Sequence, residues 1–250
     1  MAEEQVENNS SGVVLPAEFT AEPRSVATHF WISSYPFFES TLILLPGSPR
    51  TLDAPKPIDG QRMSVALRVY DADGALVNDA QLEFPSNELQ FFELEPLLGA
   101  CKLESGMKHA HLVVESEEGT GVYCRMHTRE SAALLGEPIS VTPTQGTFFP
   151  LTFASDRANL LCLVNRGESE ATLRCRLFVG KRSPEASWAV PAFASRVVNV
   201  EAEFREYALT EEGAQLQAYL RLGTKAGDLG VQLIERTDGP KEAGFFTAVS

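Results

Sequence analysis

The chain has 250 residues, and its 21 basic and 34 acidic side chains give a formal net charge of −13 at pH 7. This length allows one or two domains, and a hydrophobic fraction of 44% is ordinary for a globular chain with a buried core. The negative charge argues against a nucleic-acid partner, because broad contact with a phosphate backbone needs clustered Lys and Arg. No apolar run approaches the roughly 20 residues of a membrane-spanning helix, so membrane insertion is not expected.

The first part of the chain is polar and acidic. Residues 1–12 show no apolar periodicity, and we expect residues 1–27 to form a largely disordered leader. This segment has neither the basic start nor the apolar run of a secretory signal. We therefore expect a cytoplasmic protein.

Short apolar or alternating segments, separated by turn residues, dominate the rest of the chain. Their Val, Leu, Phe and Tyr content is typical of strands in an antiparallel β-sandwich or barrel. Residues 71–74, Asp-Ala-Asp-Gly, predict a hairpin turn, because Asp-Gly supplies the positive φ that such turns need. Only two short helices are expected, at residues 93–101 and 201–208. The predicted fold class is all-β, and the strand candidates include residues 41–45, 64–70, 80–84, 90–94, 109–115 and 122–127.

The strand pattern is repeated within the chain. Several segments of the first half match segments of the second half with small slips in loop length and one larger insertion near residues 46–61. We predict two tandem antiparallel β-sandwich domains of similar fold, residues 28–139 and 146–250, joined by a proline-stiffened linker at residues 138–146. The matched pairs are 65–70 with 171–176, 81–85 with 187–191, 91–95 with 197–201, 110–114 with 218–222, 121–122 with 230–231, and 127–128 with 236–237.

Alternation assigns the two faces of the strands near residues 109–127. Successive side chains of a strand point to opposite faces. In the second of these strands the expected core side chains are Val122, Cys124 and Met126, and those on the other face are Tyr123, Arg125 and His127. In the first strand Ala110, Leu112 and Val114 are expected to point inward, and His109 and His111 outward. We predict that the two strands form a hairpin with His109 opposite His127 and His111 opposite Arg125.

These three histidines raise the question of a metal site. His109, His111 and His127 on neighbouring strands would offer three nitrogen ligands, and the spacing of His109, His111 and Glu115 is similar to the first metal motif of cupins. A cupin-like metal-dependent enzyme is therefore one alternative. Against it, Arg125 would repel a cation, the second cupin motif is absent, and the matching positions of the second repeat carry Gln217, Tyr219 and Arg236. We expect surface or interface histidines, with no metal and no cofactor.

The remaining reactive side chains do not form a catalytic pattern. The chain has no nucleophile elbow and no Gly-rich phosphate loop, so we do not expect an enzyme. Its four cysteines form no Cys-x-x-Cys pair and lie within apolar runs. We expect them to be buried, reduced thiols. They are Cys101, Cys124, Cys162 and Cys175.

Three short segments carry distinctive motifs: Asn-Arg-Gly-Glu-Ser-Glu-Ala at residues 165–171, Val-Pro-Ala at residues 190–192, and His-Thr-Arg at residues 127–129. They resemble the Asn-x-Gly-acid-x-acid-Ala turn, the Val-Pro-Ala segment and the His-Thr-Arg segment of the sensory rhodopsin transducer family. The resemblance implies a small β-sandwich protein that forms homotetramers and carries signals from a membrane photoreceptor to cytoplasmic partners. For two fused repeats it implies a homodimer that presents four sandwiches.

The expected function is that of a non-enzymatic interaction or signalling adaptor. Exposed aromatic and Arg side chains suit a protein-binding surface. The main alternative is a carbohydrate or small-ligand binding module, in which the same aromatic rings would stack on a sugar. The residues expected to bind the partner or ligand are Tyr123, Arg125, His127 and Arg129 in the first repeat and Tyr219, Arg221 and Arg236 in the second.

Overall fold

The structure is a computed structural model that describes residues 25–34, 38–45, 62–86, 88–104, 107–128, 132–208, 214–238 and 243–248. Most of the expected leader (residues 1–24), the expected insertion (residues 46–61) and Arg129 lie outside these residues. The described part of the expected leader, residues 25–27, belongs to the first strand.

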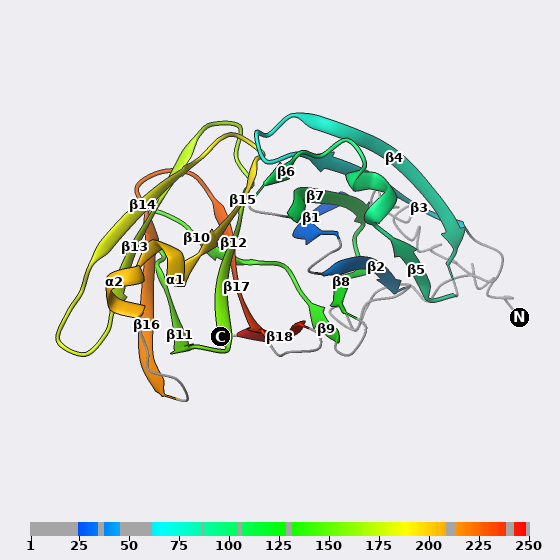
Figure 1. Cartoon of the computed structure of the whole chain (residues 1–250). Helices are drawn as coiled ribbons and strands as arrows, with labels where there is room; N and C mark the ends of the chain where they lie inside the picture. Colours follow the sequence, from blue (N-terminus) through cyan, green and yellow to red (C-terminus); the bar gives the residue numbers. More distant parts are fainter. Residues whose placement is uncertain are drawn as a thin grey trace, which may run out of the picture.

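Antiparallel strands make up most of the described residues and the helices are few and short, so the predicted all-β class is confirmed (Figure 1). They form four sheets, which we number I to IV. Sheet I contains, in spatial order, β1 (Ser25–Ser33), β7 (Met107–Glu117), β3 (Arg62–Tyr70) and β4 (Leu76–Pro85), with β6 (Leu103–Glu104) paired to β7. Sheet II contains β5 (Gln90–Glu93), β2 (Glu39–Leu45), β8 (Gly121–His127) and β9 (Ala132–Leu135).

The second half of the chain supplies the other two sheets. Sheet III contains β10 (Ile139–Val141), β17 (Leu229–Asp238), β12 (Arg157–Asn165) and β15 (Ser195–Asn199), with β18 (Ala243–Ala248) paired to β17. Sheet IV contains β11 (Thr147–Ala154), β16 (Gln215–Thr224), β13 (Ala171–Phe178) and β14 (Glu185–Val190). Because β10 pairs with β17, residues 139–141 of the expected linker are part of a strand.

The strand orders of the two halves correspond. In sheet I, β7 lies between β1 and β3, and β4 forms an edge. In sheet IV, β16 likewise lies between β11 and β13, and β14 forms an edge. In sheets II and III, β5-β2-β8 corresponds to β15-β12-β17. A short helical segment follows β5 and β15 in each case, as η1 (Glu95–Leu98) and as α1 (Val200–Glu203) with α2 (Arg205–Ala208). The expected helices at 93–101 and 201–208 are therefore present in shorter form.

The four sheets enclose two clusters of buried apolar side chains. The first cluster lies between sheets I and II, extends to residues of sheet III, and includes Phe30, Leu112 and Cys124. The second lies between sheets III and IV and includes Leu161 and Leu173. The predicted inward positions are confirmed, since Ala110, Leu112, Val114, Cys124 and Met126 are buried in the first cluster and Val122 packs against it.

Strand β12 contributes to both clusters. Leu161 and Leu163 belong to the second cluster, whereas Leu160, Cys162 and Val164 on the opposite face belong to the first. Contacts of β1 with β12 and of β7 with β15 show that the outer face of sheet III covers sheet I. The two halves of the chain are therefore joined by a buried junction.

The predicted hairpin turn at residues 71–74 is confirmed, and it lies against this junction. The Gly74 amide donates to the Asp71 carbonyl, and the Asp71 carboxylate accepts from the Asp73 and Ala75 amides. Gly74 has a φ of +84°, and a Cβ at this position would lie 2.0 Å from the Ala192 carbonyl oxygen. The turn therefore requires glycine both for its backbone conformation and for its close approach to the second half.

Candidate functional site

The outer face of sheet II carries three of the predicted partner-binding residues. Tyr123, Arg125 and His127 alternate along β8 and point away from the first core, as predicted. The register places Tyr123 beside Ile43 of β2, Arg125 beside Thr41, and His127 beside Glu39. Strands β5 and β9 extend the face on either side. We call this surface the sheet II face, and its other members are Phe91, Glu93 and Leu134.

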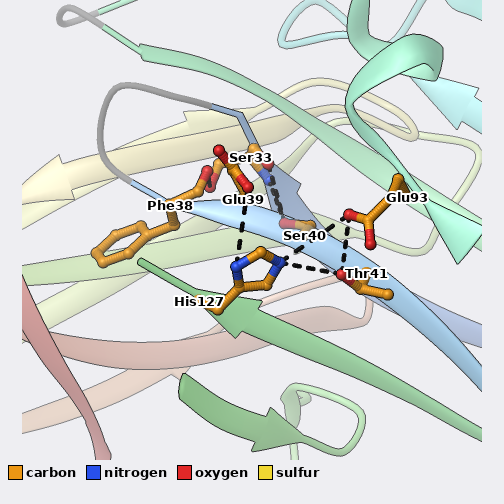
Figure 2. Close-up of polar contacts among 7 residues, drawn as sticks. All are labelled: Ser33, Phe38, Glu39, Ser40, Thr41, Glu93 and His127. Carbon is orange, nitrogen blue, oxygen red and sulfur yellow. Dashed lines mark hydrogen bonds and ion pairs between the residues drawn. The ribbon is translucent and has the colours of Figure 1, made fainter. Parts of the chain in front are cut away.

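Hydrogen bonds at one end of the sheet II face join three strands through His127 (Figure 2). His127 Nε2 lies 3.1 Å from Thr41 Oγ1, and the Thr41 hydroxyl donates to Glu93 Oε2 at 3.1 Å. Since the hydroxyl has one proton and gives it to Glu93, it accepts from His127 Nε2–H. The Glu39 and Glu93 carboxylates lie 3.8 and 4.0 Å from the ring nitrogens of His127. The geometry holds β2, β5 and β8 in register.

A second pair of hydrogen bonds fixes the entry into β2. The Ser33 amide donates to Ser40 Oγ at 3.0 Å, and the Ser40 hydroxyl donates to the Ser33 carbonyl at 2.9 Å (Figure 2). Thr41 and Ser40 are only 2% and 1% exposed. Their hydroxyls therefore form hydrogen bonds within the sheet, and the solvent-exposed surface is formed by the other residues of the sheet II face.

Apolar side chains are exposed on the same face. Phe91 is 55% exposed and Leu134 is 57% exposed, on opposite sides of the polar group around Thr41. Ile43 and Tyr123 between them are half-buried. Exposed apolar side chains grouped on one surface and bordered by charges indicate an interaction site.

The predicted hairpin of the histidine strands is wrong. Strand β7 pairs with β1 and β3 in sheet I, whereas β8 pairs with β2 and β9 in sheet II. His109 and His111 therefore do not face His127 or Arg125. Consecutive strands of a two-layer β structure often cross from one sheet to the other, and this is the case at residues 117–121. The three histidines do not form the metal site that the hairpin would have created, and no group of three or more His, Cys, Asp or Glu suited to a metal ion occurs among the described residues.

His109 and His111 instead lie in the junction between the two halves. His109 is 1% exposed, its Nδ1 lies 2.8 Å from Ser195 Oγ, and its ring stacks on Trp31. His111 is fully buried, and its Nδ1 lies 2.8 Å from the carbonyl oxygen of Phe193. His109 and His111 thus contact a side chain and the backbone of the second half, respectively.

His29 completes this group and was not identified from the sequence. Its Nδ1 lies 2.9 Å from His111 Nε2, and the two rings stack with centroids 5.1 Å apart. A carbonyl oxygen only accepts, so His111 Nδ1–H donates to Phe193, and His111 Nε2 accepts from His29 Nδ1–H. This arrangement requires a neutral His111 ring.

Burial lowers the pKa values of both histidines. It lowers the pKa of His111 to about 3, with the Arg166 charge and His29 acting in the same direction. Burial followed by the Arg166 charge also lowers the pKa of His29, although the Glu137 and Asp228 carboxylates oppose this shift. The junction therefore favours uncharged imidazole rings.

Two of the motifs found in the sequence meet beside these histidines. The side chain of Asn165 is fully buried, and its Nδ2 donates to the carbonyls of Val190 and Pro191 at 2.9 Å each. Its Oδ1 accepts from the Gly167 amide at 2.9 Å. The Asn-x-Gly turn thus holds the Val-Pro-Ala segment in place, and that segment leads directly to Phe193, the partner of His111.

The residues predicted in the second half do not join the sheet II face. Tyr219 and Arg221 alternate on β16 and lie on the outer face of sheet IV. Arg236 lies on β17 in sheet III. The predicted set is therefore distributed over three sheets. Tyr219 and Arg221 do not lie on a sheet II-type face because their strand, β16, corresponds in strand order to β7 and not to β8.

The four cysteines are all buried and free, as expected. Burial raises the pKa of the Cys124 and Cys175 thiols to about 12. These thiols are therefore protonated and behave as small apolar side chains.

The fold and the sheet II face define an all-β protein with an exposed, partly apolar surface on one of four antiparallel sheets. The chain matches no protein-family model, and no match was found among curated proteins. Among the described residues, no helix has the length and apolar character needed to cross a membrane.

Proposed function

We propose that this chain is a non-enzymatic cytoplasmic interaction adaptor built from two tandem β-sandwich repeats related to the sensory rhodopsin transducer-like family. The matching strand orders of sheets I and IV and of sheets II and III support the tandem arrangement. The binding surface is the sheet II face, and its occupant is a second copy of the chain, which gives a dimer of tandem repeats.

One observation carries this proposal. In strand order, sheet II corresponds to sheet III, and the outer face of sheet III is covered by the other half of the chain. Leu160, Cys162 and Val164 on that face are at most 5% exposed. On the sheet II face the side chains of Phe91 and Leu134 are more than half exposed. The outer face of sheet III is thus buried against the other half within the chain, whereas the corresponding sheet II face is exposed and available for a contact between chains.

The test is the mass of the protein in solution. Light scattering after size-exclusion chromatography at micromolar concentration should give twice the 27.3 kDa of the chain. Leu134→Asp should reduce the mass to that of one chain, because a carboxylate would be buried in the contact without a partner. Leu76→Asp is the matched control, since Leu76 is 51% exposed on sheet I and should leave the dimer intact. A monomeric wild-type protein, or a dimeric Leu134→Asp variant, would contradict the proposal.

A second candidate function is the binding of a carbohydrate or another small ligand. The observation that favours it is the exposure of Phe148 and Tyr219, at 58% and 55%, beside Arg221 on the outer face of sheet IV. Aromatic rings at this level of exposure offer flat apolar surfaces on which a sugar ring stacks. A thermal-shift screen against neutral sugars tests this candidate, and an unchanged melting temperature across the screen would count against it.

A further inference from the structure

A cleft of about 760 Å³ opens on the outer face of sheet IV. It is bounded by β13, β14, β16 and the turn at residues 142–146. Four cationic side chains line it, together with a single carboxylate, that of Glu185. This concentration of positive charge is unusual in a chain with a net charge of −13. The cations are Arg174, Arg176, Arg221 and Lys225.

The strand register places these charges close together. Arg176 and Arg221 are directly opposite each other on β13 and β16, an arrangement that destabilises a sheet when the charges are alike. Glu185 pairs with Arg176, and Arg221 lies over the ring of Phe148 at 5.9 Å. Among the described residues, no ion pair or hydrogen bond is formed by the side chain of Arg174. The fold therefore compensates only part of the positive charge.

The floor of the cleft beside Arg174 is open because it is formed by glycine. Gly223 is directly opposite Arg174, and a Cβ at Gly223 would have no atom within 4 Å. On the other side of Arg174 is the small side chain of Ser187. Arg174 therefore has a small side chain on one neighbouring strand and none on the other, which leaves room for a ligand group beside it.

One wall of the cleft is a hydrogen-bonded turn that carries two hydroxyl groups. Thr142 and Gln145 exchange backbone hydrogen bonds of 3.0 and 3.2 Å. Thr142 Oγ1 and Thr144 Oγ1 lie 3.4 Å apart. Gly146 lets this turn approach β16, since a Cβ there would lie 2.7 Å from the Leu222 carbonyl oxygen. Hydroxyls beside guanidinium groups add donors suited to the oxygens of an anion.

We propose that this cleft binds a small polyanion that carries two or more phosphate or sulfate groups. Arginine presents a planar fork of N–H donors that matches tetrahedral oxyanions. Cross-strand and i, i+2 neighbours on one sheet face have Cβ atoms roughly 5–7 Å apart, so the three arginines can engage adjacent anionic groups of one molecule. A cleft of this volume accommodates a ligand of ordinary metabolite size.

The experiment is calorimetric titration of the full chain at constant ionic strength with tripolyphosphate and, separately, with a sulfated disaccharide. Saturable one-to-one binding of either compound supports the proposal, and the tighter of the two identifies the anionic group. Arg174→Ala should weaken the binding at least about tenfold, because a charge-assisted hydrogen bond is lost. Lys181→Ala removes the same charge from an exposed turn outside the cleft and should change the affinity less than about twofold.

A second variant separates the cleft from general charge effects. Gly223→Glu adds a carboxylate to the floor at a position where a Cβ meets no atom within 4 Å, so it should abolish the binding without lowering the melting temperature. Four results would overturn the proposal: no binding of either compound, equal weakening by Arg174→Ala and Lys181→Ala, unchanged binding by Gly223→Glu, or tighter binding of a single-stranded oligonucleotide than of both compounds.

Discussion

Acidification should destabilise the protein through His111. The ring is fully buried, and its neutral form both donates to the Phe193 carbonyl and accepts from His29. Folding lowers its pKa from the usual 6.5 to about 3. Below pH 6.5 the unfolded chain takes up a proton that the folded chain does not accept until about pH 3. The stability that this group contributes is therefore complete above pH 6.5 and falls as the pH decreases.

The size of the effect follows from these two pKa values. Between pH 7.5 and 5.5, one proton taken up only by the unfolded chain lowers the free energy of unfolding by about 1.4 kcal/mol. His111→Gln keeps an amide donor and acceptor at the site but cannot titrate. Urea unfolding of both proteins at the two pH values should therefore show a loss that is about 1.4 kcal/mol smaller in the variant than in the wild-type protein.

Comparing the two proteins cancels the contribution of the carboxylates to the pH dependence of stability, because these groups titrate in both proteins. His127→Gln is the control for replacing a histidine outside the junction, and it should change the free energy of unfolding by less than about 1 kcal/mol at pH 7.5. Equal losses of stability in the wild-type and His111→Gln proteins would refute the reasoning, because they would show that folding does not exclude the proton from His111.

Two further predictions concern the core and the junction. Leu112→Asp should prevent folding, because it buries a carboxylate at a position with no exposure. Arg125→Ala on the exposed face should change the unfolding free energy by less than about 0.5 kcal/mol. Thermal melts in which Arg125→Ala is the more damaging variant would contradict the assigned faces. Gly74→Ala should lower the free energy of unfolding clearly more than Gly180→Ala, although both glycines have positive φ. At Gly74 a Cβ would lie 2.0 Å from the Ala192 carbonyl oxygen, whereas at Gly180 it would meet no atom within 4 Å. We expect about 1–2 kcal/mol for Gly180→Ala from its backbone conformation alone, and equal costs measured by urea unfolding would contradict the close approach.

The side-chain faces could be predicted from the sequence because a strand has a period of two. Alternation identified Leu112 and Cys124 as core positions and Tyr123 and Arg125 as outward positions, and each assignment requires only the strand itself. The pairing of β7 with β8 could not be predicted in this way. A short connection is compatible with a hairpin and with a crossing between sheets, and the choice depends on the competing partners β1, β2 and β3.

The junction was missed, although the sequence contains a signal for it. Residues 160–164, Leu-Leu-Cys-Leu-Val, are apolar without alternation, which is typical of a strand covered on both faces. Strand β7 carries the same signal from Ala110 to Val114, interrupted by a histidine. The histidine obscures the pattern because an imidazole is polar in composition but is buried here as a neutral ring with both nitrogens hydrogen-bonded.

The tandem arrangement that we propose explains why the same strand position has different chemistry in the two halves. When Leu112 is aligned with Leu220, the outward residues His111 and Val113 of β7 correspond to Tyr219 and Arg221 of β16. The first pair is buried because sheet III covers sheet I, and the second pair is exposed because no described element covers sheet IV there. A covered position must avoid unpaired charge, whereas an uncovered one can hold an arginine. The outer face of sheet I forms the junction, and the basic cleft lies on the corresponding outer face of sheet IV. Because the second half uses sheet III for the junction, the outer face of sheet IV stays available for a ligand.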